Sequence, residues 1–164
     1  MHARSFPALA TPGAGILILG SMPGQASLAA QQYYAHPRNA FWPIMGELFG
    51  AAPHLPYALR VAALARARVA VWDVLEACVR PGSLDADISA DGLVANDFAG
   101  FFHRNPGISR VYFNGVKAAQ LFSRFALPTL AGHQLAQHTL PSTSPAHARL
   151  TFAAKCDAWR VIVE

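Results

Sequence analysis

Short aliphatic runs that end at a glycine or a polar residue alternate with apolar, alanine-rich stretches along this chain. Runs of four to eight aliphatic and β-branched residues are typical of buried strands, whereas apolar residues three and four positions apart are typical of helices. The pattern predicts strands at residues 16–19, 68–75, 110–114 and 134–140, and helices at 27–32, 40–49, 59–68, 97–104, 117–125 and 148–163. Because strands separated by helices pair in parallel, we predict a three-layer α/β/α fold around a central, mainly parallel four-stranded sheet.

Length and composition favour one globular domain. The chain has 164 residues, of which 53% are hydrophobic and 13% are charged, so it can bury a sizeable core. We expect residues 1–164 to form a single domain, with residues 1–12 loosely packed. The apolar runs are too short to cross a bilayer, and residues 1–12 lack the continuous apolar segment of a signal peptide. We therefore expect a cytoplasmic protein, and we expect a monomer because nothing in the sequence demands an oligomer.

The charged residues and the cysteines limit the partners and cofactors. A formal net charge of +4 permits a polyanionic partner, but the cations are scattered arginines and two lysines, Lys117 and Lys155. Cys78 and Cys156 are far apart, and neither belongs to a CxxC motif. A structural zinc or an iron–sulfur cluster needs about four ligands. We therefore expect no metal and no cofactor.

Ligands of open α/β sheets bind beyond the carboxyl ends of the strands. Four loops with glycine, proline or polar residues follow the predicted strands, at 20–27, 73–85, 114–117 and 141–144. The glycines and the proline of the first loop allow backbone N–H groups to turn toward a ligand, although a structural turn explains that segment better when it is considered alone. Asp73 could accept a hydrogen bond from a base or cap the loop that follows, and for Asn114 a turn role is favoured.

An aromatic run and a hydroxyl-rich run could bind a nucleic acid. Residues 33–42 contain four aromatic residues, and an irregular aromatic segment can stack on a base. This role is favoured for Tyr34, whereas Phe41 is as well explained as a core residue. Ser142, Thr143 and Ser144 suit phosphate contact, although an ordinary surface loop has the same composition. His138 is either a core histidine or a donor to a leaving group.

Taken in chain order, these motifs resemble those of the uracil-DNA glycosylase superfamily. Gly-Ser-Met-Pro-Gly at 20–24 resembles its water-activating motif, and Leu-Pro-Ser-Thr-Ser at 140–144 resembles the motif that grips the strand beside the flipped nucleotide. Ala-His-Pro-Arg-Asn-Ala-Phe-Trp at 35–42 resembles the mismatch-specific enzymes. The full combination, which includes residues 33–39, 72–75, 82–85 and 96–98, resembles the hypoxanthine-DNA glycosylase family within the superfamily. The likeness runs from about residue 15 to the last residue.

One position departs from the superfamily pattern. Related enzymes carry an Asn or an Asp where this chain has Met22, and a thioether orients water poorly. In the hypoxanthine-type family the catalytic polar residue is instead the Asn of His-Pro-Arg-Asn, which is Asn39 here. The iron–sulfur branches have four ligating cysteines, and this chain has two.

The resemblance implies a monofunctional DNA glycosylase that flips a deaminated base out of a damaged duplex or a single strand. Hypoxanthine, uracil and xanthine all remain open as substrates. A nucleic-acid-binding module that kept the pocket but is catalytically weak is the alternative. The implied catalytic residues are Asn39, Ser21 and His138; the base-binding residues are Gly20, Met22, Pro23, Tyr34, Phe41, Asp73 and Asn114; and the DNA-binding residues are Ser142, Thr143, Ser144 and His147. Because both lysines fall on predicted helices, we expect no lyase activity.

Overall fold

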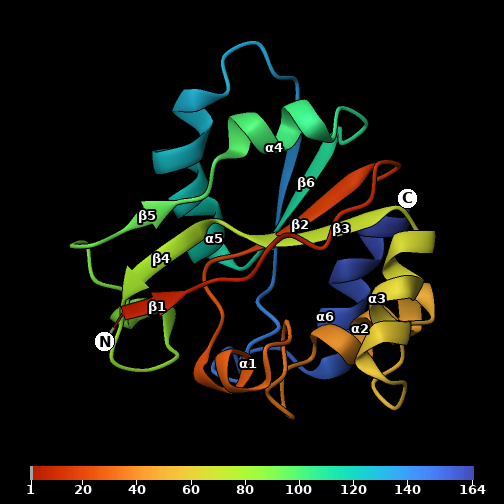
Figure 1. Ribbon diagram of the computed structural model, residues 1–164. Coiled ribbons are helices and arrows are strands. Elements are labelled where there is room, and N and C mark those ends of the chain that lie inside the picture. The colour runs from red at the N-terminus through yellow and green to blue at the C-terminus, as the bar shows by residue number, and fades with distance from the viewer. Residues whose placement is uncertain (1) are drawn as a thin grey trace.

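A computed structural model describes residues 2–164 and contains a parallel four-stranded sheet (Figure 1). Its strands are β2 (Ile16–Gly20), β3 (Val69–Asp73), β6 (Arg110–Asn114) and β7 (Ala136–Leu140). They lie in the order β3-β2-β6-β7, and every neighbouring pair is parallel. The predicted fold class is confirmed, and Gly20 and Asp73 are paired at the carboxyl ends of adjacent strands.

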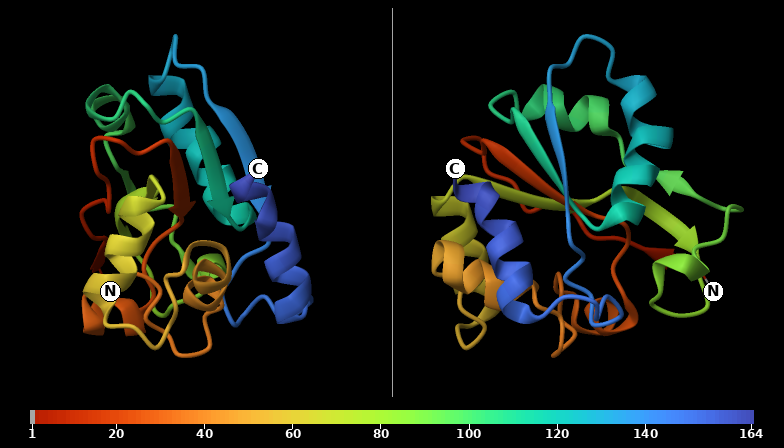
Figure 2. Two further views of the ribbon diagram at one scale, coloured as in Figure 1. Left: turned by 90° about the vertical axis from the view of Figure 1, so that its right-hand side faces the viewer. Right: turned by 180° about the vertical axis from the view of Figure 1, so that it is seen from behind.

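Helices cover both faces of this sheet (Figure 2). One face carries α2 (Phe41–Phe49), α3 (Tyr57–Arg66) and α6 (Phe152–Trp159), packed on Ile16, Ile18, Val69, Val71 and Tyr112. The other face carries α4 (Phe98–Arg104) and α5 (Val116–Leu121), packed on Leu17, Leu19, Ala70, Trp72, Val111 and Phe113. Successive side chains of a strand point to opposite faces, so each buried strand supplies both cores.

A second, antiparallel sheet was not predicted. It has the order β1-β4-β5 and consists of β1 (His2–Arg4), β4 (Leu75–Val79) and β5 (Val94–Ala95). The predicted strand at 68–75 therefore ends early: after Asp73, the Val74 N–H donates to the Gly20 carbonyl, and the chain leaves for the second sheet. The apolar residues on both sides of Asp73 read as one strand, so periodicity gave no sign of this change of partner strand.

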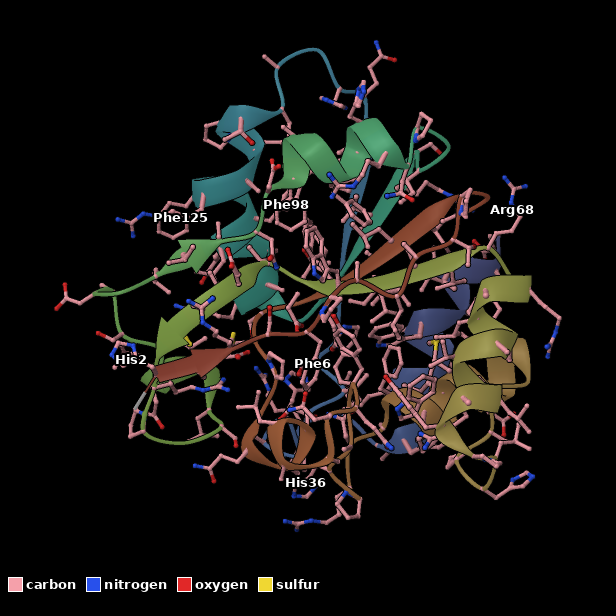
Figure 3. The ribbon with its side chains drawn as sticks, in the orientation of Figure 1. His2, Phe6, His36, Arg68, Phe98 and Phe125 are labelled. Carbon is pink, nitrogen blue, oxygen red and sulfur yellow. The ribbon has the colours of Figure 1, made fainter. Side chains whose placement is uncertain are left out.

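The expectation of a loosely packed segment at residues 1–12 is wrong for the residues that the structure describes; Met1 lies outside them. β1 pairs with β4, and Leu9 bridges to Val71. The Phe6 carbonyl accepts from the Trp72 Nε1–H at 3.2 Å, and the side chain of Phe6 points into the middle of the molecule (Figure 3). This segment packs firmly because its backbone pairs with β4, and because its carbonyls accept hydrogen bonds from the Trp72 indole and the Tyr33 phenol.

The remaining elements are short. They are α1 (Gln25–Ala30), the 3₁₀ turns Asp85–Asp87, Leu127–Thr129 and Arg160–Val163, and a π-helical turn at Phe122–Ala126 that continues α5. Two predicted helix starts are corrected. Asp97 caps α4 by accepting from the Gly100 N–H at 3.0 Å, and Thr151 caps α6, so that helix begins four residues later than predicted. Among residues 2–164, no helix combines the length and the apolar character that a membrane crossing requires.

Candidate active site

A cavity of about 790 Å³ lies at the carboxyl ends of the parallel strands. All four loops that the sequence marked contribute to it, together with the aromatic run. The lining includes residues 20–27, 83–86, 114–116 and 140–147, and also Tyr33, Tyr34, His36, Asn39 and Asp73. This is the place where a parallel α/β sheet binds ligands, because the loops that follow adjacent strands converge there.

Gly20, Asp73 and Tyr34 meet on one wall of the cavity. A Cβ on Gly20 would lie 2.6 Å from Asp73 Oδ1 and 2.8 Å from the Tyr34 hydroxyl, so only glycine fits at this position. Asp73 is 2% exposed, and its Oδ2 has no hydrogen-bond partner in the described chain. The Tyr34 hydroxyl oxygen is also buried and makes no regular hydrogen bond, although the nearby Asn114 side chain acts on it by lowering the pKa of the phenol. Polar atoms left in this way in a cavity wall are available to a ligand.

Burial raises the pKa of Asp73 to about 7, and the nearby carboxyl of Asp85 adds to the effect while the guanidinium of Arg80 opposes it. Burial, followed by the charge of Asp73, also raises the pKa of Tyr34 far above its ordinary value. The phenol therefore keeps its proton and remains a hydrogen-bond donor, whereas the carboxyl can exist in either form near neutral pH.

The first loop is clamped by residues that were not among the predicted site residues. The Ser21 hydroxyl donates to the Asp85 carboxylate, and the Gln25 N–H donates to Ser83 Oγ at 2.8 Å. Arg80, only 2% exposed, donates to the carbonyls of Pro23 and Ser83. Ser21 is thus held by a carboxylate, which gives it a structural partner inside the cavity wall. Nothing local in the sequence marks Arg80 as buried.

Tyr34 and Phe41 have different positions relative to the cavity. Tyr34 lines it and has a positive φ of 54°, a conformation that non-glycine residues rarely adopt outside special sites. Phe41 is fully buried and stacks on Tyr34, with ring centroids 4.0 Å apart. The predicted contact of Phe41 with a base is therefore corrected: Phe41 is a core residue that supports the Tyr34 ring from behind.

Asn39 lies on the cavity wall and is half-buried. Its Oδ1 accepts from the Phe41 N–H at 2.9 Å, which orients the amide at the start of α2. Its Nδ2 makes no hydrogen bond within residues 2–164, and Oδ1 has a second lone pair, so the amide can still hold a ligand or a water. His36 also lines the cavity and lies at the outer edge of the molecule beside α1 (Figure 3).

The hydroxyl-rich loop is anchored through a buried amide. Asn114 Nδ2 donates to Thr143 Oγ1 at 2.9 Å, and the Thr143 N–H donates to Asn114 Oδ1 at 2.9 Å. Thr143 is 1% exposed, so its predicted role in DNA contact is corrected to a structural one. Ser142, Ser144 and His147 remain on the cavity lining and are half-buried.

His138 does not belong to the cavity. It lies on the edge strand β7, is exposed, and stacks on Tyr112 with ring centroids 5.1 Å apart. The predicted catalytic role of His138 is therefore wrong, because its side chain covers the sheet and the cavity begins two residues later, at Leu140. Gly20, Met22 and Pro23 do line the cavity, as predicted, and so do Asp73 and Asn114.

Comparisons with known proteins show the family of this chain. The model of the uracil DNA glycosylase superfamily matches residues 7–163. A protein of Methanosarcina acetivorans named hypoxanthine DNA glycosylase is 36% identical over 152 residues, which cover 92% of each chain. A protein of the same name from Methanosarcina barkeri is 36% identical over 121 residues, 73% of this chain and 75% of that one.

A solved structure has the same fold. The solution NMR structure of a Methanosarcina acetivorans protein, described as a candidate uracil DNA glycosylase, superimposes with a TM-score of 0.78 at 31% identity over the full length of both chains. The family match spans residues 7–163, and the solved structure covers the whole chain. This chain belongs to the uracil DNA glycosylase superfamily.

Proposed function

We propose that this protein is a monofunctional DNA glycosylase that takes a deaminated base, hypoxanthine in the first place, out of DNA and hydrolyses its N-glycosidic bond. The observation that carries the proposal is the cavity at the carboxyl ends of the strands, where Asn39 and unpartnered buried polar atoms face one space in a member of this superfamily. The names of the two relatives, which are 36% identical to this chain, support hypoxanthine as the first substrate to test.

Asn39 is the residue to which we assign the attacking water. An amide takes up no proton near neutral pH, so Asn39 orients the water and does not act as a general base. This suits a dissociative reaction in which the bond to the base breaks early and water captures an oxocarbenium-like sugar. Met22 lines the cavity but cannot take this role, since a thioether is only a weak acceptor.

The first loop contributes backbone and shape. Its clamp to Ser83, Asp85 and Arg80 holds Gly20, Ser21 and Met22 against the cavity in a fixed geometry. Preorganised groups of this kind stabilise the charge of a departing base at low cost in reorganisation. His36 also lines the cavity, and we assign to it a hydrogen bond to the leaving base.

The hydroxyl-rich loop is assigned to the DNA backbone. Ser142 and Ser144 lie on the cavity lining, and His147 is the bulkiest side chain at the end of this loop, suited to fill the gap that a flipped base leaves. We expect the DNA to be a damaged duplex or a single strand, and the protein to act as a cytoplasmic monomer.

Asn39→Ala tests the assignment of the water. Single-turnover excision from duplexes that contain hypoxanthine, uracil or xanthine should be fastest for hypoxanthine and should fall by about 10²- to 10³-fold in the variant, the usual cost of a lost orienting group. DNA affinity should change little, because phosphate contacts supply most of it. Gln137→Ala, an exposed change on β7, is the matched control.

Met22 motivates one other candidate, a binding module without chemistry. It stands where related enzymes have the water-orienting group. If the wild-type protein, in excess over DNA, binds damaged duplexes but releases no free base, this second candidate is correct. A variant Asn39→Ala with near-normal rates would instead move the catalytic role away from Asn39.

A further inference from the structure

Lys155 is a buried cation without a counter-charge. It lies on α6 and is only 6% exposed. The ion pairs found among residues 2–164 do not include it, since they join Arg4 to Glu76 and Arg160 to Asp157. A buried charge is ordinarily paired with an opposite charge and held by hydrogen bonds, because water no longer stabilises it. Lys155 lacks such a counter-charge within the described chain.

The ammonium group of Lys155 lies beside the hydroxyl-rich loop. Its one side-chain hydrogen bond among the described residues runs from Nζ to the Ser144 carbonyl at 3.5 Å, longer than a normal bond of this kind. The same carbonyl accepts from the His147 N–H at 3.0 Å, so it is already paired. An ammonium group has three N–H donors, and one long bond to a neutral carbonyl leaves most of their capacity unused.

The loop beside Lys155 presents hydroxyl donors to the cavity, which Ser142 and Ser144 both line. Ser142 Oγ accepts from the Ser144 N–H at 3.1 Å, and Ser144 Oγ accepts from the Ala146 N–H at 3.2 Å. Each hydroxyl uses an oxygen lone pair in these bonds and keeps its own proton for donation. Hydroxyl donors in front of a buried cation are suited to an anion.

The loop has stronger anchors than Lys155. The Thr143 side chain and N–H pair with Asn114, each at 2.9 Å, and the Trp159 Nε1–H donates to the Pro141 carbonyl at 2.9 Å. The contact of Lys155 at 3.5 Å adds little to these bonds. Anchoring the loop therefore gives no reason to bury a charge there, since an apolar side chain would pack at lower cost.

We propose that Lys155 supplies the positive charge with which the hydroxyl-rich loop binds one phosphate of the DNA beside the flipped nucleotide. The Ser142 and Ser144 hydroxyls donate to that phosphate, and the phosphate provides the counter-charge that the folded chain lacks. The inference rests on the proposed function, which makes DNA the ligand. Charges attract more strongly in a buried site than at the surface. Burial lowers the pKa of Lys155, and a bound phosphate opposes this change because it favours the charged amine.

Binding of an uncleavable duplex tests the inference separately from catalysis. The duplex carries 2′-fluoro-2′-deoxyinosine, and Kd is measured over a range of salt concentrations for the wild type, Lys155→Met, Lys155→Gln and Arg66→Met. Arg66 is an exposed cation on α3 outside the cavity lining, so its variant controls for the loss of one positive charge. Losing one phosphate contact lowers the slope of log K against log salt by about 0.9, which corresponds to about 8-fold weaker binding at about 0.1 M salt. Both Lys155 variants should show this change, and Arg66→Met should keep the wild-type slope.

Thermal unfolding separates this role from a structural one. Without DNA, Lys155→Met should have a Tm at or above that of the wild type, because the variant no longer buries a charge without a counter-charge. A lower Tm combined with an unchanged salt slope would show that Lys155 only anchors the loop. An unchanged slope in Lys155→Met or in Lys155→Gln, whichever folds, overturns the inference even where hypoxanthine is excised.

Neutral methylphosphonates identify the phosphate. Each phosphate next to the lesion is replaced in turn, and Kd is measured for the wild type and Lys155→Met. One replacement should weaken binding by the wild type but not by the variant, since two interacting groups show non-additive effects. If every replacement weakens both proteins equally, Lys155 binds no phosphate. If the wild type releases no free base but this coupling is found, the proposed function is wrong and the inference stands.

Discussion

Replacing Asp73 with asparagine should make the protein more stable, and the gain should grow with pH. The folded protein holds the pKa of this carboxyl at about 7, chiefly through burial and then through the charge of Asp85, against 3.8 for an ordinary Asp. Between these two values the folded chain binds a proton that the unfolded chain has released. Raising the pH through this range therefore favours the unfolded state, and above pH 7 the folded protein bears the full cost of a buried charge.

The size of the effect follows from the pKa. One pKa unit corresponds to about 1.4 kcal/mol, so the difference between 3.8 and about 7 corresponds to about 4 kcal/mol of unfolding free energy at high pH. The amide of the Asp73→Asn variant has no charge to bury. The free energy of unfolding of the variant, minus that of the wild type, should therefore rise by about 4 kcal/mol between pH 4 and pH 8.5. Asp85 and Arg80 act electrostatically on the Asp73 carboxyl, and the charge of Asp73 in turn acts on Tyr33 and Tyr34.

Urea unfolding at half-unit pH steps measures this difference, and Asp91→Asn is the matched control because its carboxylate is exposed. The control should follow the wild type at every pH. A difference between Asp73→Asn and the wild type that stays constant from pH 4 to pH 8.5 would refute the reasoning, because it would mean that Asp73 titrates alike in the folded and unfolded chains. If Asp73→Asn is more stable than the wild type but discriminates less well between bases, the charge of Asp73 serves function at a cost in stability.

Two further predictions concern single contacts, and a third concerns the two lysines. Gly20→Ala would place a Cβ 2.6 Å from Asp73 Oδ1, and it should lower single-turnover excision by about 100-fold while unfolding free energy falls by only about 1–3 kcal/mol; full activity would contradict the proposed cavity wall. Thr143→Val would leave the Asn114 amide without its acceptor and should cost about 1–3 kcal/mol in urea unfolding, whereas Thr143→Ser should cost clearly less. The wild-type protein should neither nick an abasic duplex nor be trapped on it by borohydride, since Lys117 and Lys155 are absent from the cavity lining; a trapped adduct that Lys155→Met removes would show that the enzyme is bifunctional.

The sequence by itself determined the parallel sheet and the place of the site. Hydrophobic periodicity is a local property, so Arg110–Asn114 could be read as a strand with its final bounds, and the polar or glycine residues that end three strands indicated where the cavity would lie. Asp73 was predicted as a carboxylate in an apolar run, and Asn39 was predicted only through the resemblance to a family; the structure places both on the cavity lining.

Only the tertiary structure decided which side chains face the cavity and what each one contacts. Both Tyr34 and Phe41 are aromatic residues of the same run, yet the Tyr34 ring lines the cavity and the Phe41 ring stacks behind it in the core. Arg80 and Asp85 hold the first loop from 57 and 64 positions away, and Thr143 pairs with Asn114 across 29 positions. Such pairings depend on how distant segments meet, and no local pattern of residues records that meeting.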